Sequence, residues 1–129
     1  MEHQELTAQI LGACFEVTNE LGAGFLESVY ERALCVALAD RGLRAVTQVP
    51  LEVRFRGNVV GEFLADIVVE HKVMVELKAA KALAPEHQAQ LINYLNATDI
   101  EVGLLVNFGN AQLEYRRCYR GRRNCPAGT

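Results

Sequence analysis

The chain has no tryptophan and only three prolines among its 129 residues, and it contains no internal repeat or low-complexity tract. No apolar run approaches the roughly 20 residues that a helix needs to cross a bilayer. The polar start, residues 1–5, has neither the basic nor the apolar segment of a signal peptide. These absences argue against a membrane span and a secretory leader, so we expect a cytoplasmic protein with no membrane partner.

Cysteine is also scarce, and the four cysteines form no C-x-x-C pair. Their spacing argues against a structural zinc site. Cys14 and Cys35 lie in predicted helices among apolar neighbours, where free thiols act as small hydrophobic side chains. Cys118 and Cys125 lie near the C-terminus. Cytosolic thiols are usually reduced, but a disulfide between these two cysteines stays open.

The charge of the chain is small in total and unevenly distributed. The net charge is −3, yet residues 115–129 contain five arginines and no acidic residue, so the rest carries 8 basic and 16 acidic side chains. Such a tail can contact the phosphates of a nucleic acid, or it can fold back onto its own body or onto a second subunit. The arginines considered as phosphate contacts are Arg116, Arg117, Arg120, Arg122 and Arg123.

Hydrophobic spacing predicts three helices and five strands. Apolar residues recur at steps of three and four along residues 6–21, as in an amphipathic helix. The segment 33–39 is apolar almost all round, so the second helix is expected to be central and buried. A proline and an acid mark the first turn of the third helix. The predicted helices are 6–21, 26–41 and 84–97, and the predicted strands are 45–55, 59–69, 73–77, 102–108 and 112–117.

The resulting order, α-α-β-β-β-α-β-β, predicts a mixed central sheet with helices packed against it, which is α/β or α+β in class. A chain of 129 residues suits one domain with one core. We place a single domain in residues 1–117 and a basic C-terminal tail in residues 118–129.

The most informative residues are Asp66 and the triplet Glu76-Leu77-Lys78, which lie on two hydrophobic segments. These segments are rich in β-branched residues and are separated by the polar residues 70–72, so they are expected to form an antiparallel hairpin. Side chains alternate between the faces of a strand, so Glu76 and Lys78 share one face.

The length of the hairpin loop decides whether Asp66 joins that face. If residues 70–72 form a three-residue loop, Val69 pairs with Val73 and Asp66 falls opposite Glu76. A two-residue loop would place the two acids on opposite faces, because a slip of one residue inverts every side chain.

Two facing carboxylates repel and need a compensating cation when they are partly buried. Lys78 supplies one positive charge, and a hard divalent ion held by carboxylate oxygens supplies more. The alternative is a solvated strand face with an ordinary Glu/Lys pair, because short motifs often match by chance.

Helical positions add further candidates. Glu27 lies in the first turn of the second helix, where an acid also complements the helix dipole. Glu31, four residues on, repels it, and a nearby ion would remove that repulsion. His87, Gln90 and Tyr94 share one face of the third helix, where they either line a cleft or form a boundary stripe of satisfied polar groups.

In order, Gly24-x-x-Glu27-x-x-Tyr30, Asp66, Glu76-x-Lys78 and Gln90-x-x-x-Tyr94 closely resemble the GxxExxY family, which belongs to the PD-(D/E)XK nuclease-like superfamily. The resemblance extends from about Leu6 to Phe108 and includes Gln48-Val49-Pro50. It implies a restriction-endonuclease-like core, a mixed sheet flanked by helices. The arginine-rich tail departs from the usual ending of the family.

The resemblance also implies roles for individual residues. Glu27, Asp66 and Glu76 would bind Mg²⁺ or Mn²⁺, together with the backbone carbonyl of Leu77, while Lys78 would orient or activate the attacking water. Asp66, Glu76 and Lys78 would therefore be the catalytic residues. Supporting or substrate-binding roles would fall to Gln90, Tyr94, Tyr30 and His87.

The sequence thus predicts a divalent-metal-dependent nuclease that hydrolyses phosphodiester bonds of nucleic acid, with DNA expected rather than RNA. Two alternatives stay open. One is a noncatalytic nucleic-acid-binding or regulatory module with the same fold, and the other is a structural or assembly protein whose acids merely hold an ion. A homodimer is compatible with the sequence, but no residue requires it.

Overall fold

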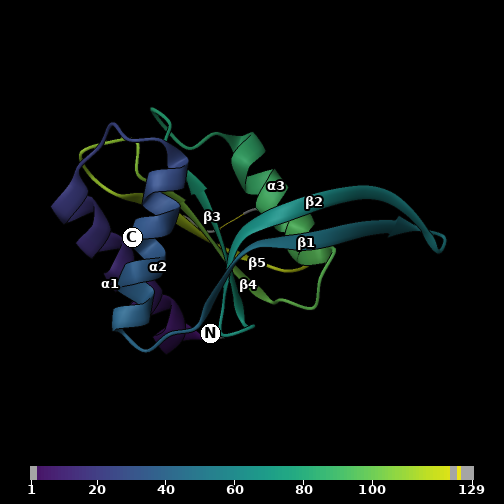
Figure 1. Cartoon of the computed structure of the whole chain (residues 1–129). Helices are drawn as coiled ribbons and strands as arrows, with labels where there is room; N and C mark the ends of the chain where they lie inside the picture. Colours follow the sequence, from purple (N-terminus) through teal and green to yellow (C-terminus); the bar gives the residue numbers. More distant parts are fainter. Residues whose placement is uncertain (1–2, 123–124, 126–129) are drawn as a thin grey trace.

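The computed structural model describes residues 3–122 and residue 125, and it contains the predicted elements in the predicted order. Figure 1 shows them in space. The helices are α1 (Gln4–Leu21), α2 (Glu27–Asp40) and α3 (Pro85–Asn96), and the strands are β1 (Ala45–Phe55), β2 (Asn58–Val69), β3 (Val73–Lys78), β4 (Val102–Asn107) and β5 (Glu114–Tyr119).

The five strands form one mixed sheet in the order β1-β2-β3-β4-β5, in which only β3 and β4 run parallel. Two hydrophobic clusters flank this sheet. One contains residues of α1 and α2 with inward side chains of β3 and β4, and the other contains residues of α3 with Met74 and Leu105. The parallel β3–β4 pair needs a crossover connection, and α3 provides it, so the topology places α3 beside the C-terminal end of β3.

Helix α2 is not the central, buried helix that the sequence predicts. Only Tyr30, Leu34 and Leu38 are buried along it, and Val36 is exposed. The segment 33–39 looked apolar because it is rich in alanine. Alanine favours helices wherever they lie, so its presence does not report burial. With one buried stripe, α2 is an amphipathic helix, and Figure 1 shows it on the outside of the body.

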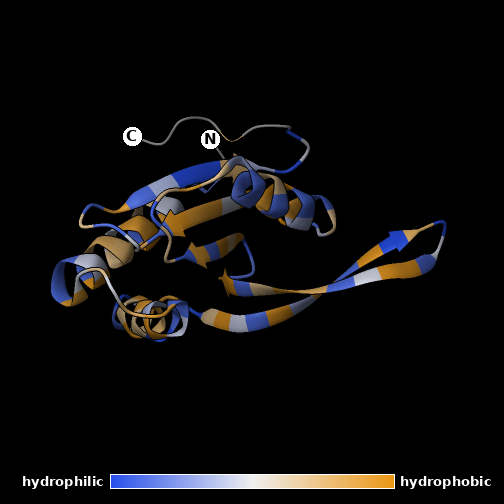
Figure 2. Cartoon of the chain, turned by 90° about the horizontal axis from the view of Figure 1, so that it is seen from above, coloured by the Kyte–Doolittle hydropathy of each residue, from blue (hydrophilic) through white to orange (hydrophobic). Residues whose placement is uncertain are grey.

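The outer part of the β1–β2 hairpin, residues 50–64, projects from the body as a two-stranded ribbon that we call the arm (Figures 1 and 2). It forms because β2 pairs with β3 only through residues 67–69, while its pairing with β1 continues to Asn58. Arg56 and Gly57 turn the chain at its tip, and both have positive φ, as a two-residue hairpin loop requires.

The hairpin between β2 and β3 has a three-residue loop, residues 70–72. This is the loop length that places Asp66 and Glu76 opposite each other. Val69 pairs with Val73, and the ladder continues through Val68 with Met74 and Ile67 with Val75. The register that brings Asp66 opposite Glu76 is therefore confirmed.

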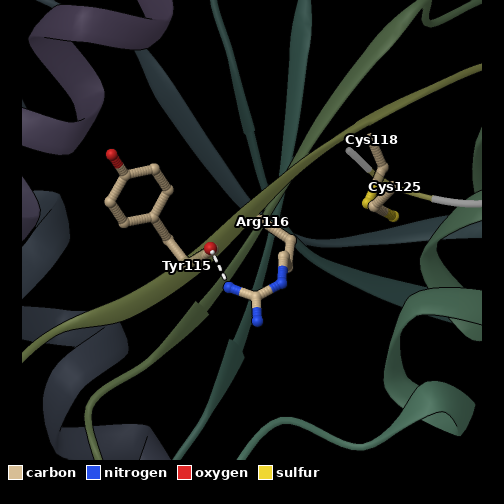
Figure 3. Close-up of a disulfide and its surroundings, with 4 residues drawn as sticks. All are labelled: Tyr115, Arg116, Cys118 and Cys125. Atoms are coloured by element: carbon tan, nitrogen blue, oxygen red, sulfur yellow. Dashed lines mark hydrogen bonds between the residues drawn. A yellow bond between two sulfur atoms is a disulfide. The ribbon is translucent and has the colours of Figure 1, made fainter. Parts of the chain in front are cut away.

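Strand β5 reaches Tyr119, so the sheet includes two residues that we assigned to the basic tail. Cys118 is fully buried, and its sulfur is bonded to that of Cys125, which ties the following turn back to the sheet (Figure 3). The disulfide left open by the sequence is present in this structure. No helix in the described part of the chain is long and apolar enough to cross a membrane.

The disulfide closes a short loop, with a sequence separation of 7. Loop-closure entropy for such a loop corresponds to about 2 kcal/mol of stability. In oxidising buffer, Cys125→Ala is expected to lower the free energy of unfolding by about that amount, measured by urea denaturation. In buffer with a reductant, neither protein has the disulfide. The two free energies of unfolding should then differ only by the contribution that the packing of one side chain makes. An equal difference in both buffers would show that the covalent bond contributes nothing.

Candidate active site

The candidate site lies just past the last β2–β3 rung, Ile67 with Val75, where β2 continues into the arm. Figure 1 shows the two strands diverging there. The backbone N–H of Asp66 donates to Glu76 Oε2 at 2.6 Å, and the N–H of Leu77 donates to Asp66 Oδ2 at 2.8 Å. Both donors lie beyond the last rung of the β2–β3 ladder, Ile67 with Val75. Each carboxylate therefore binds a backbone group of the opposite strand, which brings the two acids together.

The pKa of Glu76 is strongly raised by its surroundings. Glu76 is 4% exposed, and burial first, then the negative charge of Asp66, raises its pKa from 4.5 to about 8, against the opposing effects of the Asp66 N–H and Lys78. In these surroundings the charged form of the carboxylate is destabilised relative to its protonated form. A bound cation would offset that cost.

Lys78 follows Glu76 by two residues and is half-buried at the end of β3. Its Nζ donates to Gln90 Oε1 of α3 at 3.4 Å. Helix α3 packs closely on β4 at Gly103, which pairs with Met74 and has no side chain; a Cβ there would lie 2.9 Å from Leu91, the residue after Gln90. The small residue on β4 thus helps to place Gln90 over Lys78.

Tyr94, one helical turn after Gln90, lies mostly buried beside the acids. Burial first, then the charges of Glu76 and Asp66, raises the pKa of its hydroxyl. The hydroxyl therefore stays protonated at neutral pH and can donate a hydrogen bond.

Glu27 reaches the site from the other side, at the start of α2. The preceding loop is fixed by the fully buried Tyr30, whose hydroxyl donates to Gly22 O at 2.6 Å and accepts from Phe25 N–H at 3.2 Å. The Tyr30 ring stacks on Phe108 with centroids 4.8 Å apart. Tyr30 thus supports the loop that carries Glu27.

Glu27 and Asp66 line one pocket of about 150 Å³. Its other lining residues are Ser28, Glu31, Gln48 and Leu77. We did not predict site roles for Ser28, Glu31 and Gln48. The i, i+4 spacing of Glu31 from Glu27 was a signal for one of them, whereas Gln48 stood in the family motif without a role.

The donors at this site suit a hard divalent ion. Asp66 and Glu76 each use one oxygen, Oδ2 and Oε2, for the backbone bonds described, and the other oxygens are left for an ion. Mg²⁺ usually takes one or two carboxylates and keeps several waters. Among the residues described, no three His, Cys, Asp or Glu side chains converge closely enough to hold a metal, so an ion here would be held partly by water.

His87 has a local structural task. Its Nδ1 accepts a hydrogen bond from the N–H of Ala84 at 3.0 Å, at the beginning of α3. This bond satisfies one of the free backbone donors of the helix N-terminus. The ring therefore helps to fix the start of the helix that carries Gln90.

The arginines of the C-terminal region contact their own body. Arg116 donates to Tyr115 O at 2.8 Å (Figure 3), Arg117 donates to Thr7 Oγ1 at 3.3 Å, and Arg120 donates to Thr98 O at 2.7 Å. The Arg122 guanidinium lies over the Tyr119 ring at 5.1 Å. Arg123, another predicted phosphate contact, lies outside the described residues.

A larger groove of about 920 Å³ separates the arm from α3 and adjoins the site through Gln90 and Tyr94. Phe63 of the arm packs against Tyr94 at its floor, with ring centroids 5.4 Å apart. The groove contains Arg54, which forms an ion pair with Glu52 at 2.9 Å. Arg54 is the one basic residue among the described residues that line the groove, so the groove offers little free positive charge.

Comparison with known proteins gives two findings. The sequence model of the PD-(D/E)XK nuclease superfamily matches residues 4–118. The crystal structure of SSO0001 has a similar fold, with a TM-score of 0.59 at 21% identity, over 72% of this chain and 49% of that one. The chain therefore spans about half the length of that protein. No curated protein is detectably similar to the chain in sequence.

Proposed function

We propose that this chain, which belongs to the PD-(D/E)XK nuclease superfamily, is a divalent-metal-dependent nuclease that hydrolyses phosphodiester bonds of nucleic acid, with DNA as the expected substrate. The observation that carries the proposal is the reciprocal arrangement of Asp66 and Glu76 beside Lys78. We also propose that the chain is a member of the GxxExxY family within this superfamily and that the protein is cytoplasmic.

In this proposal Asp66 and Glu76 hold Mg²⁺ or Mn²⁺ through their remaining oxygens, with the backbone carbonyl of Leu77. Glu27 contributes from α2. When bound, the ion supplies positive charge for the phosphate and lowers the pKa of a bound water. The carboxylates position that ion at the end of the β2–β3 ladder.

Lys78 provides the second positive charge of the site. Its ammonium can donate hydrogen bonds to the attacking water and to a phosphate oxygen as negative charge develops. Gln90 restrains the lysine by accepting a hydrogen bond from its ammonium. The Tyr94 hydroxyl, protonated at neutral pH, is a neutral donor on the same side.

A second candidate is a noncatalytic nucleic-acid-binding or regulatory module. One observation favours it: among the described residues, the acids do not converge on a ready-made metal cage. Two of its candidate phosphate contacts, Arg116 and Arg120, lie near acidic partners, Glu114 at 4.0 Å and Glu101 at 3.7 Å. In this second candidate, the C-terminal arginines contact phosphates. Asp66 and Glu76 only bind the backbone N–H groups at the end of the β2–β3 ladder. A homodimer fits either candidate.

The test is cleavage of labelled single- and double-stranded DNA and RNA with Mg²⁺ or Mn²⁺. Wild type should cleave at least one substrate, and EDTA should stop the reaction. Asp66→Ala and Lys78→Ala should each lower the rate by about 10³-fold or more. Lys78→Ala leaves the Leu77 N–H bond to Asp66 intact, so it separates loss of chemistry from loss of structure. Folded wild type that binds a substrate without cleaving it would favour the second candidate.

A further inference from the structure

Gln48 has an unusual backbone in the middle of β1. Its φ is 51°, in the left-handed region that residues other than glycine, asparagine and aspartate rarely adopt. The β1–β2 ladder registers Thr47 with Ile67 and Val49 with Ala65, but it has no rung between Gln48 and Asp66. The irregular residue is thus the one opposite the candidate metal ligand.

The side chain of Gln48 has a specific partner across the pocket. Its Nε2 donates to Glu31 Oε1 of α2 at 2.7 Å. Both residues line the pocket of about 150 Å³ with Glu27 and Asp66. An amide can hold a carboxylate by hydrogen bonding without neutralising it, so this bond fixes the position of Glu31 and preserves its negative charge.

A purely structural role for this residue would be served at least as well by glycine, which adopts a φ of 51° without strain. Glutamine accepts the strain and uses its side chain to bridge β1 and α2. Strained backbone that is held by a hydrogen bond at a pocket is typical of positioning residues.

We propose that Gln48 is a positioning residue that holds Glu31 at the mouth of the pocket, where the two residues set the affinity for the divalent ion. This inference rests on the proposed function, because the ion is the one held by Asp66 and Glu76. Glu31, which lines the same pocket as Glu27 and Asp66, would act on the ion through its negative charge. Partners of this kind typically change metal affinity by 10- to 100-fold.

The test uses Gln48→Gly, which relieves the strain and removes the side chain, and Mn²⁺ affinity measured by titration calorimetry. The affinity is expected to fall about 10-fold or more, while the melting temperature stays at or above that of wild type. Arg56→Gly is the matched control, because Arg56 also has a φ of 51° but lies at the tip of the arm. It should leave the affinity unchanged.

A double-mutant cycle with Glu31→Gln shows whether Gln48 acts through Glu31. On that background, Gln48→Gly should have little further effect on Mn²⁺ affinity. Unchanged affinity in Gln48→Gly, or an equal loss in Arg56→Gly, overturns the proposal while the proposed nuclease stands. Wild type that binds no Mn²⁺ overturns both.

Discussion

Replacing Glu76 with glutamine is expected to abolish cleavage and at the same time stabilise the fold. The side chain keeps its shape and an oxygen that can accept from the Asp66 N–H, so the end of the β2–β3 ladder is preserved. It loses the charge that an ion requires, and the rate should fall by about 10³-fold or more. It also removes a carboxylate that is 4% exposed and faces another acid, so the melting temperature above pH 8 should rise by several degrees.

The control for this variant is Glu101→Gln. Glu101 is half exposed and lies 3.7 Å from Arg120, away from the acids, so its replacement should change neither rate nor stability much. Cleavage assays and thermal denaturation of both variants provide the measurement. A Glu76→Gln protein that is inactive and also less stable than wild type would mean that the carboxylate stabilises the fold, contrary to our expectation.

The stability of the metal-free protein is expected to fall as the pH rises from about 5 to about 8. Glu76 has a pKa of about 8 in the folded protein, against a usual value of 4.5. Between these values the folded chain binds a proton that the unfolded chain has released, so the free energy of unfolding decreases with rising pH. The loss is complete once the pH passes the folded pKa. In Glu76→Gln this dependence should disappear.

With a divalent metal present, the stability of the protein should no longer fall as the pH rises from about 5 to about 8. The ion binds the ionised carboxylate, so its apparent affinity should rise with pH up to about 8 and then level off. Binding at pH 7 should release a proton, which calorimetry in buffers of different ionisation enthalpy detects. Melting curves from pH 5 to pH 9, with EDTA and with Mg²⁺, complete the experiment. Parallel curves with and without metal would contradict an ion at Glu76.

Local rules predicted the hairpin that carries Asp66 and Glu76 but left its register open. The three polar residues 70–72 allowed a loop of two or three residues, and the structure has the three-residue loop that places Asp66 opposite Glu76. Helix spacing placed Gln90 and Tyr94 on one side of α3. The site roles of these residues stay predictions.

The parts that sequence reasoning missed depend on contacts between distant segments. Nothing in the residue type of Gln48 indicates a left-handed backbone. That conformation accompanies a hydrogen bond to the distant Glu31 and a break in the β1–β2 ladder opposite Asp66. The alternating pattern of residues 59–69 predicted a strand correctly. It could not show that the first part of this strand pairs with β1 alone and projects from the body, since that depends on how far β3 extends beside it.

The arm also affects how the protein behaves in concentrated solution. Phe55, Val60 and Leu64 expose apolar side chains on a ribbon with little of the body around it, and such ribbons readily add strands from other molecules. Pro50 interrupts the hydrogen-bonding edge of β1, and alternating charges accompany it. We expect colloidal stability to depend on a small set of polar positions that do not line the pocket of Glu27 and Asp66. They are Glu52, Arg54, Arg56 and Glu62.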